Sequence, residues 1–316
     1  MNEKPMFSVV IPIYNKGPHI TRAINSVLKQ TVSDFEILLI NDASTDNSME
    51  EAKKIIDSRI RIFNREQPGP GGYAARNLGI LQATAEWVAF LDADDEWFPD
   101  HLEKMLSLSI QFPGINIMGC GWAFNRQNVS IRNKYFISNF YKGNHILDVK
   151  TYILKYINKQ PALWTSIACV KLSSPIVKDL FPDANKAKRG GDLYAWLKMI
   201  CYHKEMAWSA HLGAIYHQDS VNMVTKLASS MPNLMEREIY EDLGKNLDSK
   251  EKKLLKSYLN IQLRNAWIGN IARSNPNFKL LPRIYFGGNI FIVFILILIS
   301  ISPKFILKIL VKLKMR

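Results

Sequence analysis

The sequence predicts an α/β fold built on a mostly parallel, doubly wound sheet with helices on its faces. Uncharged, β-prone segments alternate four times with helical segments over residues 7–112. The second of these strands, residues 35–40, lacks the polar and apolar alternation of a half-exposed strand. A parallel sheet covered on both faces accounts for both features.

The first half of the chain contains the most regular elements. Its apolar runs are bounded by Gly, Pro and Asn, and Pro18 suits the first turn of a helix. We expect strands at residues 7–14, 35–40, 59–63 and 87–91, and helices at about residues 18–28, 49–57, 73–83 and 99–111.

The second half is less regular. Residues 125–160 are rich in Asn, Lys and Tyr without a clean period, which predicts a variable insert with one helix at 149–157. We expect the other elements to be strands at residues 115–122 and 164–170, an amphipathic helix from Gly190 onward, and a short strand before His217.

Three carboxylates follow the fourth strand at once, at Asp92, Asp94 and Asp95. Like charges this close repel each other unless a positive charge lies among them. In extended backbone Asp92 and Asp94 point to the same side and can converge on one ligand. This pattern predicts either a Mg²⁺ or Mn²⁺ site completed by substrate phosphates, or a solvated acidic turn.

Other strand ends carry groups suited to a nucleotide. Asp42 could accept a hydrogen bond from a base N–H, although it could instead cap the next helix. The loop at residues 69–72 permits close backbone approach, and Arg76 on the following helix could attract phosphate. The loop matches neither a Walker loop nor a dinucleotide fingerprint, which argues against an NTPase and a dehydrogenase.

The net charge of +13 belongs to the end of the chain. Residues 252–316 hold twelve Lys or Arg and no acid, which leaves 29 bases against 28 acids in residues 1–251. This distribution argues against a nucleic-acid partner. The three cysteines form no metal-type pair, so we expect a reducing compartment, and no secretory leader is apparent before the first strand.

Four motifs follow one another along the chain: Ser8-Val9-Val10-Ile11-Pro12-Ile13-Tyr14-Asn15, Asn41-Asp42-Ala43-Ser44-Thr45-Asp46, Ala75-Arg76-Asn77-x-Gly79 and Leu91-Asp92-Ala93-Asp94-Asp95. In this order they resemble glycosyltransferase family 2, a family of inverting sugar-nucleotide enzymes with the GT-A fold. The resemblance is clear over residues 7–112 and patchier to about residue 220.

The resemblance implies roles on the nucleotide side. Asp42 would read the base, most often uracil, Asp92 would bind the ribose side, and Asp94 would bind Mn²⁺ or Mg²⁺ as in a DXD motif. Arg76 would contact phosphate. The base pocket would be lined by Pro12, Tyr14 and Asn15.

On the acceptor side the resemblance makes Asp192 the catalytic base. An inverting transfer needs one base to take the proton of the acceptor hydroxyl, although Asp192 could also be a helix cap. The family carries Glu-Asp here, and Gly191 replaces the Glu, which bears on acceptor positioning more than on catalysis. His217 lies where some relatives place a metal or diphosphate ligand, or it is structural.

The tail predicts membrane association. Residues 284–303 carry no charge, and after Pro303 the residues Lys304, Lys308 and Lys312 recur among apolar residues. A basic amphipathic helix of this kind suits an anionic lipid surface. An interfacial or re-entrant anchor fits better than a span, because a span would place five basic residues on the far side.

We therefore expect a GT-A domain at residues 1–225, with a nucleotide half at about 7–112 and an acceptor half at about 113–225. A helical basic linker, 226–283, and a membrane-associating tail, 284–316, follow it. The expected function is transfer of a single sugar from a nucleotide-sugar donor to a glycan or lipid-linked acceptor, at the cytoplasmic face of the plasma membrane. The run Gln262-Leu263-Arg264-Asn265-Ala266-Trp267 is similar to the Gln-x-x-Arg-Trp motif of processive family members, but its spacing differs. We therefore expect transfer of one sugar and not synthesis of a polymer.

Two other readings remain. A glycoside hydrolase would use two of the clustered carboxylates as its acid and its nucleophile or base. Such a pair must flank a sugar, roughly 5 to 10 Å apart, and the three carboxylates at one strand end are bunched too tightly for that. A non-catalytic, membrane-associated protein that binds nucleotide sugars would be consistent with the Glu-to-Gly departure at Gly191.

Overall fold

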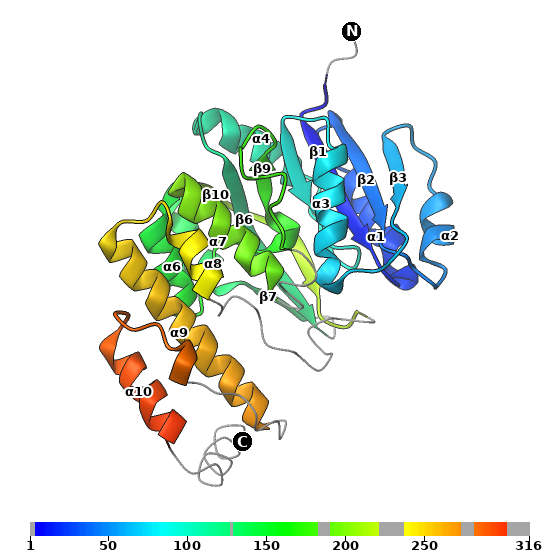
Figure 1. The fold of residues 1–316 in the computed structure, drawn as a ribbon. Helices are drawn as coiled ribbons and strands as arrows, with labels where there is room; N and C mark the ends of the chain where they lie inside the picture. Colours follow the sequence, from blue (N-terminus) through cyan, green and yellow to red (C-terminus); the bar gives the residue numbers. More distant parts are fainter. Residues whose placement is uncertain (1–3, 127–128, 183–189, 221–236, 273–280, 302–316) are drawn as a thin grey trace.

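The computed structural model describes residues 4–126, 129–182, 190–220, 237–272 and 281–301. The first half alternates strand and helix as the sequence predicts (Figure 1). Its elements are β1 (Phe7–Ile13), α1 (Gly17–Leu28), β2 (Phe35–Asn41), α2 (Ser48–Lys53), β3 (Ile60–Asn64), α3 (Tyr73–Gln82) and β4 (Trp87–Phe90).

The central sheet has the strand order β3-β2-β1-β4-β9-β6-β10-β5. Strands β1 to β4 are all parallel, and Phe7 of β1 pairs with Phe35 of β2 on one side and Trp87 of β4 on the other. Their carboxyl ends therefore meet at one edge of the sheet, where open α/β folds bind ligands. The predicted doubly wound α/β fold is confirmed.

The second half is a mixed sheet. Its elements are β5 (Glu96–Trp97), α4 (His101–Gln111), β6 (Ile117–Arg126), β7 (Val129–Arg132), α5 (Lys134–Asn139), β8 (His145–Asp148), α6 (Val149–Ile157), β9 (Cys169–Lys171), α7 (Gly191–His203) and β10 (Glu205–His217). Strand β9 runs antiparallel to both β4 and β6 and so joins the two halves. The two long strands β6 and β10 are parallel.

Two expectations for this half need correction. The insert at residues 125–160 contains β7, α5 and β8 besides the predicted helix α6. Strand β7 forms a hairpin with β6, and β8 pairs with the distant strand β10, a contact that a sequence period does not reveal. The strand predicted at 164–170 is a strand only at Cys169–Lys171, because Thr165–Ile167 form a 3-10 turn. Ser166 in that turn hydrogen-bonds to the acidic turn instead of joining a sheet.

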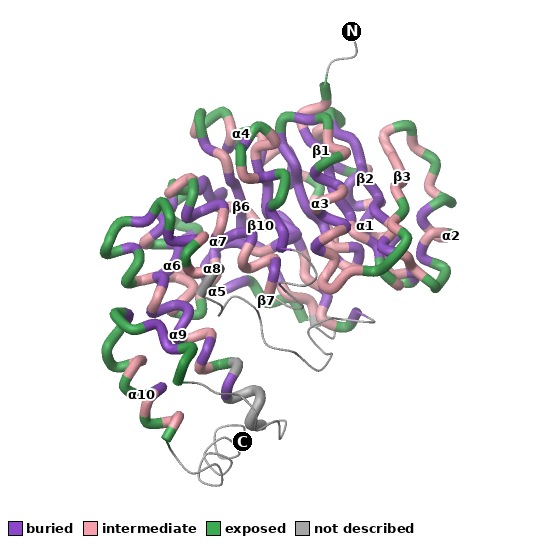
Figure 2. Tube along the Cα trace, viewed as in Figure 1, coloured by how far each residue is buried: buried purple, intermediate pink, exposed green. Residues whose placement is uncertain are grey.

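The core follows the sheet (Figure 2). The residues of β1, β2 and β4 are almost all buried, and the three cysteines are free and buried. Helix α3 approaches β1 closely at Gly79, where an added Cβ would lie 2.3 Å from Val10 Cγ1. The glycine in the Ala75-Arg76-Asn77-x-Gly79 motif therefore permits the packing of α3 against the sheet.

Three further helices follow the sheet: α8 (Arg237–Gly244), α9 (Ser249–Ala272) and α10 (Ile290–Ile301). Helix α9 packs on α6, and α10 lies beside α9, remote from β3 (Figure 1). A second apolar cluster joins the two helices through Leu263, Trp267, Ile284 and Leu296.

The opposite face of α10 is exposed (Figure 2). The large apolar side chains on it are Ile290, Phe291, Phe294, Ile295, Leu298 and Ile301. Within the described part of the chain, no helix combines the length and the hydropathy needed to traverse a bilayer. The amphipathic helix predicted around Lys304, Lys308 and Lys312 lies outside the described residues.

Candidate active site

The acidic turn is held in place by a serine and a backbone amide. Ser166 Oγ accepts a hydrogen bond from Asp92 N at 3.1 Å and donates one to Asp95 Oδ2 at 2.6 Å. The backbone N–H of His217 donates to the other Asp95 oxygen at 3.3 Å. Asp95 is fully buried, and this burial, together with the charges of Asp94 and Asp92, raises its pKa well above the usual range. Asp95 therefore fixes the turn.

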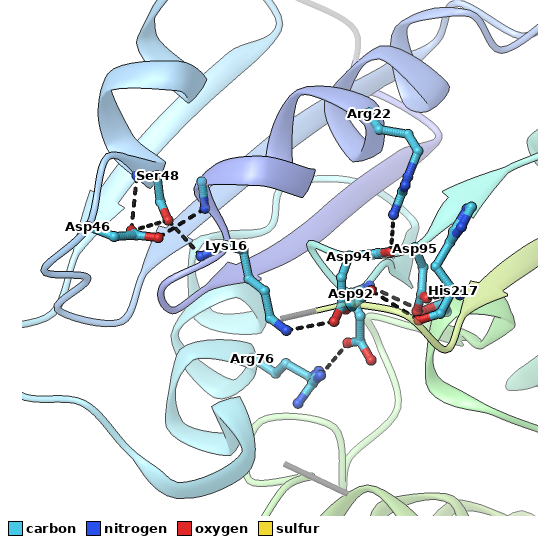
Figure 3. A network of polar contacts seen from close by, with 12 residues as sticks. Lys16, Arg22, Asp46, Ser48, Arg76, Asp92, Asp94, Asp95 and His217 are labelled. Carbon is cyan, nitrogen blue, oxygen red and sulfur yellow. Dashed lines mark hydrogen bonds and ion pairs between the residues drawn. The ribbon is translucent and has the colours of Figure 1, made fainter. Parts of the chain in front are cut away.

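Asp94 faces two cations from the region of α1 (Figure 3). Lys16 Nζ lies 2.6 Å from Asp94 Oδ2, and Arg22 Nη2 donates to the Asp94 carbonyl oxygen at 2.6 Å. Lys16 stands immediately before α1, and Arg22 lies in that helix. Because β1 pairs with β4, the segments that follow these two strands must meet.

Sequence reasoning missed both Lys16 and Arg22. The available signal was the position of Lys16, which follows Asn15 at the end of β1 and so had to lie near the end of β4. Arg22 could not be recognised in this way, because it contacts Asp94 from the second turn of a helix.

Asp92 forms an ion pair with Arg76, which is 6% exposed on α3 (Figure 3). Burial raises the pKa of Asp92, Arg76 opposes this effect, and the charges of Asp94 and Asp192 add to it. Arg76 Nη1 also donates to Gly71 O at 2.7 Å, which ties the glycine-rich loop to the helix. Gly71 and Gly72 both adopt the left-handed backbone conformation that glycine favours.

The side chains of Arg22 and Arg76 each have one buried donor, the Nε–H group, that is not used within the described part of the chain. Among the described residues, neither Nε atom has a hydrogen-bond acceptor, although both are buried. With Lys16, these two arginines place three cations around the turn at Asp92 and Asp94. A site of this kind suits a ligand with several anionic oxygens.

Asp42 is almost fully buried at the end of β2 and already has partners. It forms an ion pair with Arg65 and accepts a hydrogen bond from Gly69 N at 3.1 Å. Asp42 is therefore a structural link between β2 and the glycine-rich loop, and a base N–H would have to share its oxygens. Arg65 is a further residue that sequence reasoning missed.

The other predicted nucleotide residues lie at the end of β1. Pro12 packs toward the glycine-rich loop, since a Cβ on Gly72 would be 3.5 Å from Pro12 Cβ. Tyr14, the residue after β1, is 45% exposed. Asn15 Oδ1 accepts from Thr45 N at 2.8 Å and so holds the loop after β2. The structure thus gathers Pro12, Tyr14 and Asn15 at one edge.

Asp46 is purely structural in this arrangement. Its carboxylate accepts from Gly17 N at 3.1 Å and Ser48 N at 3.0 Å, and its pKa is lowered by these bonds against the effect of burial. It therefore joins the starts of α1 and α2 (Figure 3).

Asp192 lies in the first turn of α7, next to Gly191, whose N–H donates to the Tyr73 hydroxyl oxygen at 2.9 Å. Burial raises the pKa of Tyr73 to about 12, and the next contribution is the negative charge of Asp192. The same charge acts on Asp92 and Arg76. The fold therefore brings the charge of Asp192 within electrostatic range of residues that lie about a hundred positions earlier in the chain.

His217 is near the turn through its backbone, but its ring has another partner. His217 Nε2 lies 3.3 Å from Glu96 Oε2, and burial lowers the pKa of the imidazole. In the described ranges no three His, Cys, Asp or Glu side chains are grouped so that they could hold a metal ion by themselves. In those ranges, therefore, Asp94 and His217 do not belong to a group of three side chains that could bind a metal ion.

Comparison with known proteins agrees with this geometry. The model of the family "Glycosyl transferase family 2" matches residues 8–163. YibD of Escherichia coli K12, described as an uncharacterized glycosyltransferase, is 37% identical over 126 residues, which are 39% of this chain and 36% of that protein. EpsJ of Bacillus subtilis, described in the same way, is 37% identical over 120 residues, 37% of this chain and 34% of EpsJ. The chain thus spans about a third of the length of these relatives.

Solved structures share the fold over a longer stretch. The crystal structure of Staphylococcus aureus TarS 1–349 in complex with UDP-GlcNAc has a TM-score of 0.71 and 17% identity, and the match covers 88% of this chain and 78% of that one. The complex of the same TarS fragment with UDP has a TM-score of 0.66, with coverage of 85% and 75%. The chain thus has the GT-A fold, and its residues 8–163 belong to glycosyl transferase family 2.

Proposed function

We propose that this protein transfers a single sugar, with inversion, from a nucleoside-diphosphate sugar to a lipid-linked or glycan acceptor in cell-surface polysaccharide biosynthesis. A UDP-sugar is the donor that we favour, because the TarS neighbour binds UDP and UDP-GlcNAc. The observation that carries the proposal is that α3 links the two sides of the site: Arg76 pairs with Asp92, and Tyr73 accepts a hydrogen bond from Gly191 N, the residue before Asp192.

The donor would lie along the edge formed by β1, β2 and β4. Tyr14 and Pro12 would flank the base, Asp42 would accept from a base N–H, and Asp92 would bind the ribose. The diphosphate would lie between Lys16 and Arg76, since both are cations with buried or half-buried side chains. Such charges act strongly because solvent screens them poorly.

A divalent cation fits this site only if it takes ligands from the substrate. Mg²⁺ and Mn²⁺ are commonly bound by one or two carboxylates, with phosphate and water oxygens completing the shell. Asp94 offers one carboxylate, and within the described residues no cluster of three potential protein ligands exists. Mn²⁺ or Mg²⁺ bound at Asp94 would neutralise negative charge on the departing diphosphate. His217 would join the site only by leaving Glu96.

The chemistry that we propose for Asp192 is general base catalysis. The acceptor hydroxyl oxygen forms a bond to the anomeric carbon, the bond from that carbon to the diphosphate oxygen breaks, and the hydroxyl proton passes to the Asp192 carboxylate. Lys16 and Arg76 stay with the diphosphate as its charge grows. The acceptor would enter from the side of β6 and β10, the half that contains His217.

A donor-binding panel tests the proposal. Nucleoside diphosphates and their sugars are added to the full chain with and without Mn²⁺, and the melting temperature is followed. We expect a rise with one UDP-sugar, a larger rise with Mn²⁺, and little effect of Mn²⁺ alone. Release of sugar from an oligosaccharide without any nucleotide would favour the hydrolase instead. Donor binding without transfer to any acceptor would favour the non-catalytic protein.

We also propose that residues 284–316 attach the protein to the cytoplasmic face of the plasma membrane. The exposed face of α10 consists of Ile and Phe with Leu298, and the acid-free region from residue 252 onward supplies positive charge. Apolar residues beside positive charge suit the interface of an anionic bilayer. An acceptor carried by a lipid would then be presented at the same surface.

A further inference from the structure

We propose that Tyr73 is the positioning residue for Asp192: its hydroxyl holds the start of α7, and its ring sets the spacing between α7 and the glycine-rich loop. The inference rests on the proposed role of Asp192 as the base. It concerns how that carboxylate reaches its place, and it gives Tyr73 a function beyond packing in the core.

The first observation is a helix cap supplied by another element. Helix α7 begins at Gly191, and its N-cap residue, Gly190, has a φ of 76° and no side chain that could accept a hydrogen bond. The N–H of Gly191 instead donates to the Tyr73 hydroxyl oxygen at 2.9 Å. Free N–H groups at a buried helix start destabilise it, so this contact fixes where α7 begins. Asp192 is the next residue.

The second observation is the space that the Tyr73 ring occupies. A Cβ on Gly191 would lie 2.8 Å from two ring carbons of Tyr73 and 2.7 Å from Pro182 Cγ. A Cβ on Gly71 would lie 2.4 Å from Tyr73 Cζ. The ring therefore lies between the glycine-rich loop and the start of α7. Each of these segments has a glycine, Gly71 or Gly191, where the ring approaches it. The Glu expected at position 191 from the family pattern would require Tyr73 or Pro182 to move.

The third observation is that one face of α3 holds both sides of the site. Arg76, one turn after Tyr73, forms the ion pair with Asp92. Asn77 holds the backbone of Phe181 by two hydrogen bonds, of 2.8 Å and 3.1 Å. The Phe181 ring stacks on Tyr73 with 6.4 Å between centroids and 8° between planes. Helix α3 thus fixes the approach to α7 as well as the carboxylate on the donor side.

Tyr73 is suited to position the base and not to replace it. It is 4% exposed, and burial followed by the charge of Asp192 raises its pKa to about 12. The phenol therefore keeps its proton at any ordinary pH. A change at Tyr73 should alter the rate of transfer through Asp192, and it should leave the binding of the nucleotide, which Arg76 and Asp92 contact, largely unchanged.

The variant Tyr73→Phe tests this, because it keeps the ring and removes only the hydroxyl oxygen. We expect kcat to fall roughly tenfold, the effect of one lost hydrogen bond at a catalytic helix, while the donor KM stays within about twofold. The matched control is Tyr135→Phe, which removes another buried hydroxyl, 2.9 Å from His145 Nε2 in the α5–β8 region. The control should lose comparable stability and keep its kcat.

A double variant separates this inference from the proposed function. If Tyr73 acts through Asp192, Tyr73→Phe should cost nothing further in an Asp192→Asn background. Full activity of Asp192→Asn alone would remove the proposed base. An inactive Asp192→Asn together with an unchanged kcat in Tyr73→Phe would overturn only the role of Tyr73, as would a multiplicative loss in the double variant.

A second substitution covers the case in which Tyr73→Phe folds poorly. Gly191→Ala places a methyl group where the Tyr73 ring lies, at a residue whose backbone does not require glycine. We expect it to lower kcat and to leave nucleotide binding by calorimetry intact. Normal kcat in Gly191→Ala would contradict the tight contact on which the inference depends.

Discussion

Asp94 Oδ2 and Lys16 Nζ lie 2.6 Å apart, and both side chains are only 13% exposed. They come from the segments after two neighbouring parallel strands, β4 and β1. Each side chain neutralises the charge of the other when no ligand is bound. A diphosphate that enters must therefore share Lys16 with Asp94, or bring a cation that takes over Asp94.

Lys16→Gln should weaken donor binding by about tenfold or more, because it removes a poorly screened cation and leaves Asp94 to repel the diphosphate. Calorimetry with UDP and with UDP-sugars measures this loss. Lys54→Gln is the matched control, since Lys54 forms an exposed pair with Glu51 on α2 and should be neutral. Equal donor affinity in Lys16→Gln and the wild type would exclude Lys16 from the diphosphate site.

Asp192→Asn should lower kcat by roughly a hundredfold or more, as expected when a general base loses its ability to take a proton. Nucleotide binding should remain, because Asp192 is not a donor contact in the proposed site. Steady-state kinetics and a binding isotherm are the two measurements. Asp179→Asn, an exposed carboxylate before α7, should behave as the wild type.

His101 should make the protein less stable in acid. It is fully buried on α4, its Nε2 has no partner among the described residues, and burial lowers its pKa to about 3 from 6.5. In the unfolded chain it binds a proton below about pH 6.5. Stability is therefore full above pH 6.5 and falls as the pH drops toward 3, by about 2 kcal/mol between pH 7 and 5.

Urea unfolding at several pH values measures this slope. In His101→Phe the loss between pH 7 and 5 should be smaller by about that amount, whatever the absolute stability of the variant. His19→Phe is a comparison that should change the slope less, because burial also lowers the pKa of His19 but its side chain on α1 is only partly buried. An unaltered slope in His101→Phe would show that other groups dominate the acid response.

Gly79→Ala should destabilise the fold by about 1–3 kcal/mol, because the new methyl group would overlap Val10, which lies in the middle of β1. Thermal unfolding followed by circular dichroism measures the loss. Gly114→Ala gives a useful contrast, since nothing lies within 4 Å of its Cβ position and only its positive φ opposes the change. A stable Gly79→Ala would imply that α3 can move away from the sheet.

The exposed face of α10 should bind anionic vesicles. Cosedimentation with vesicles that contain phosphatidylglycerol should fall several-fold in Phe291→Ser/Phe294→Ser, because each ring loses apolar contact with the bilayer. Ile110→Ser is the control, as Ile110 is 72% exposed on α4. Unchanged binding of the double variant would exclude α10 as the contact surface.

The fold of residues 7–112 was predictable because the sequence signals there are local. Apolar runs end in Gly, Pro and Asn, and the carboxyl ends of parallel strands must share one edge, so Asp42 and Asp92 could be placed together from the sequence. Helix α6 was predicted at its observed bounds, Val149–Ile157, although the region around it has no clean period.

The missed features depend on contacts between distant segments. The run at residues 164–170 has strand propensity, but Ser166 bonds to Asp92 and Asp95 and turns the backbone away from the sheet. The contacts of Arg65 with Asp42 and of Arg22 with Asp94 depend on how distant loops pack, so the sequence alone did not indicate them. Tyr73 looked like an ordinary helix residue, because its partner Gly191 lies 118 positions further along the chain.

The buried carboxylate of Asp95 bears on how this protein could be re-engineered. Its partners, the Ser166 hydroxyl and the backbone N–H of His217, both come from the second half, so one acid side chain fixes the two halves in register. A chimera that exchanges the second-half segments between related chains should thus keep the geometry of the turn at residues 92–95 if a serine is retained at 166 and the strand still ends at 217. Loss of that serine should shift the turn even in a well-folded graft, because Asp92 N and Asp95 Oδ2 would both lose a hydrogen-bond partner.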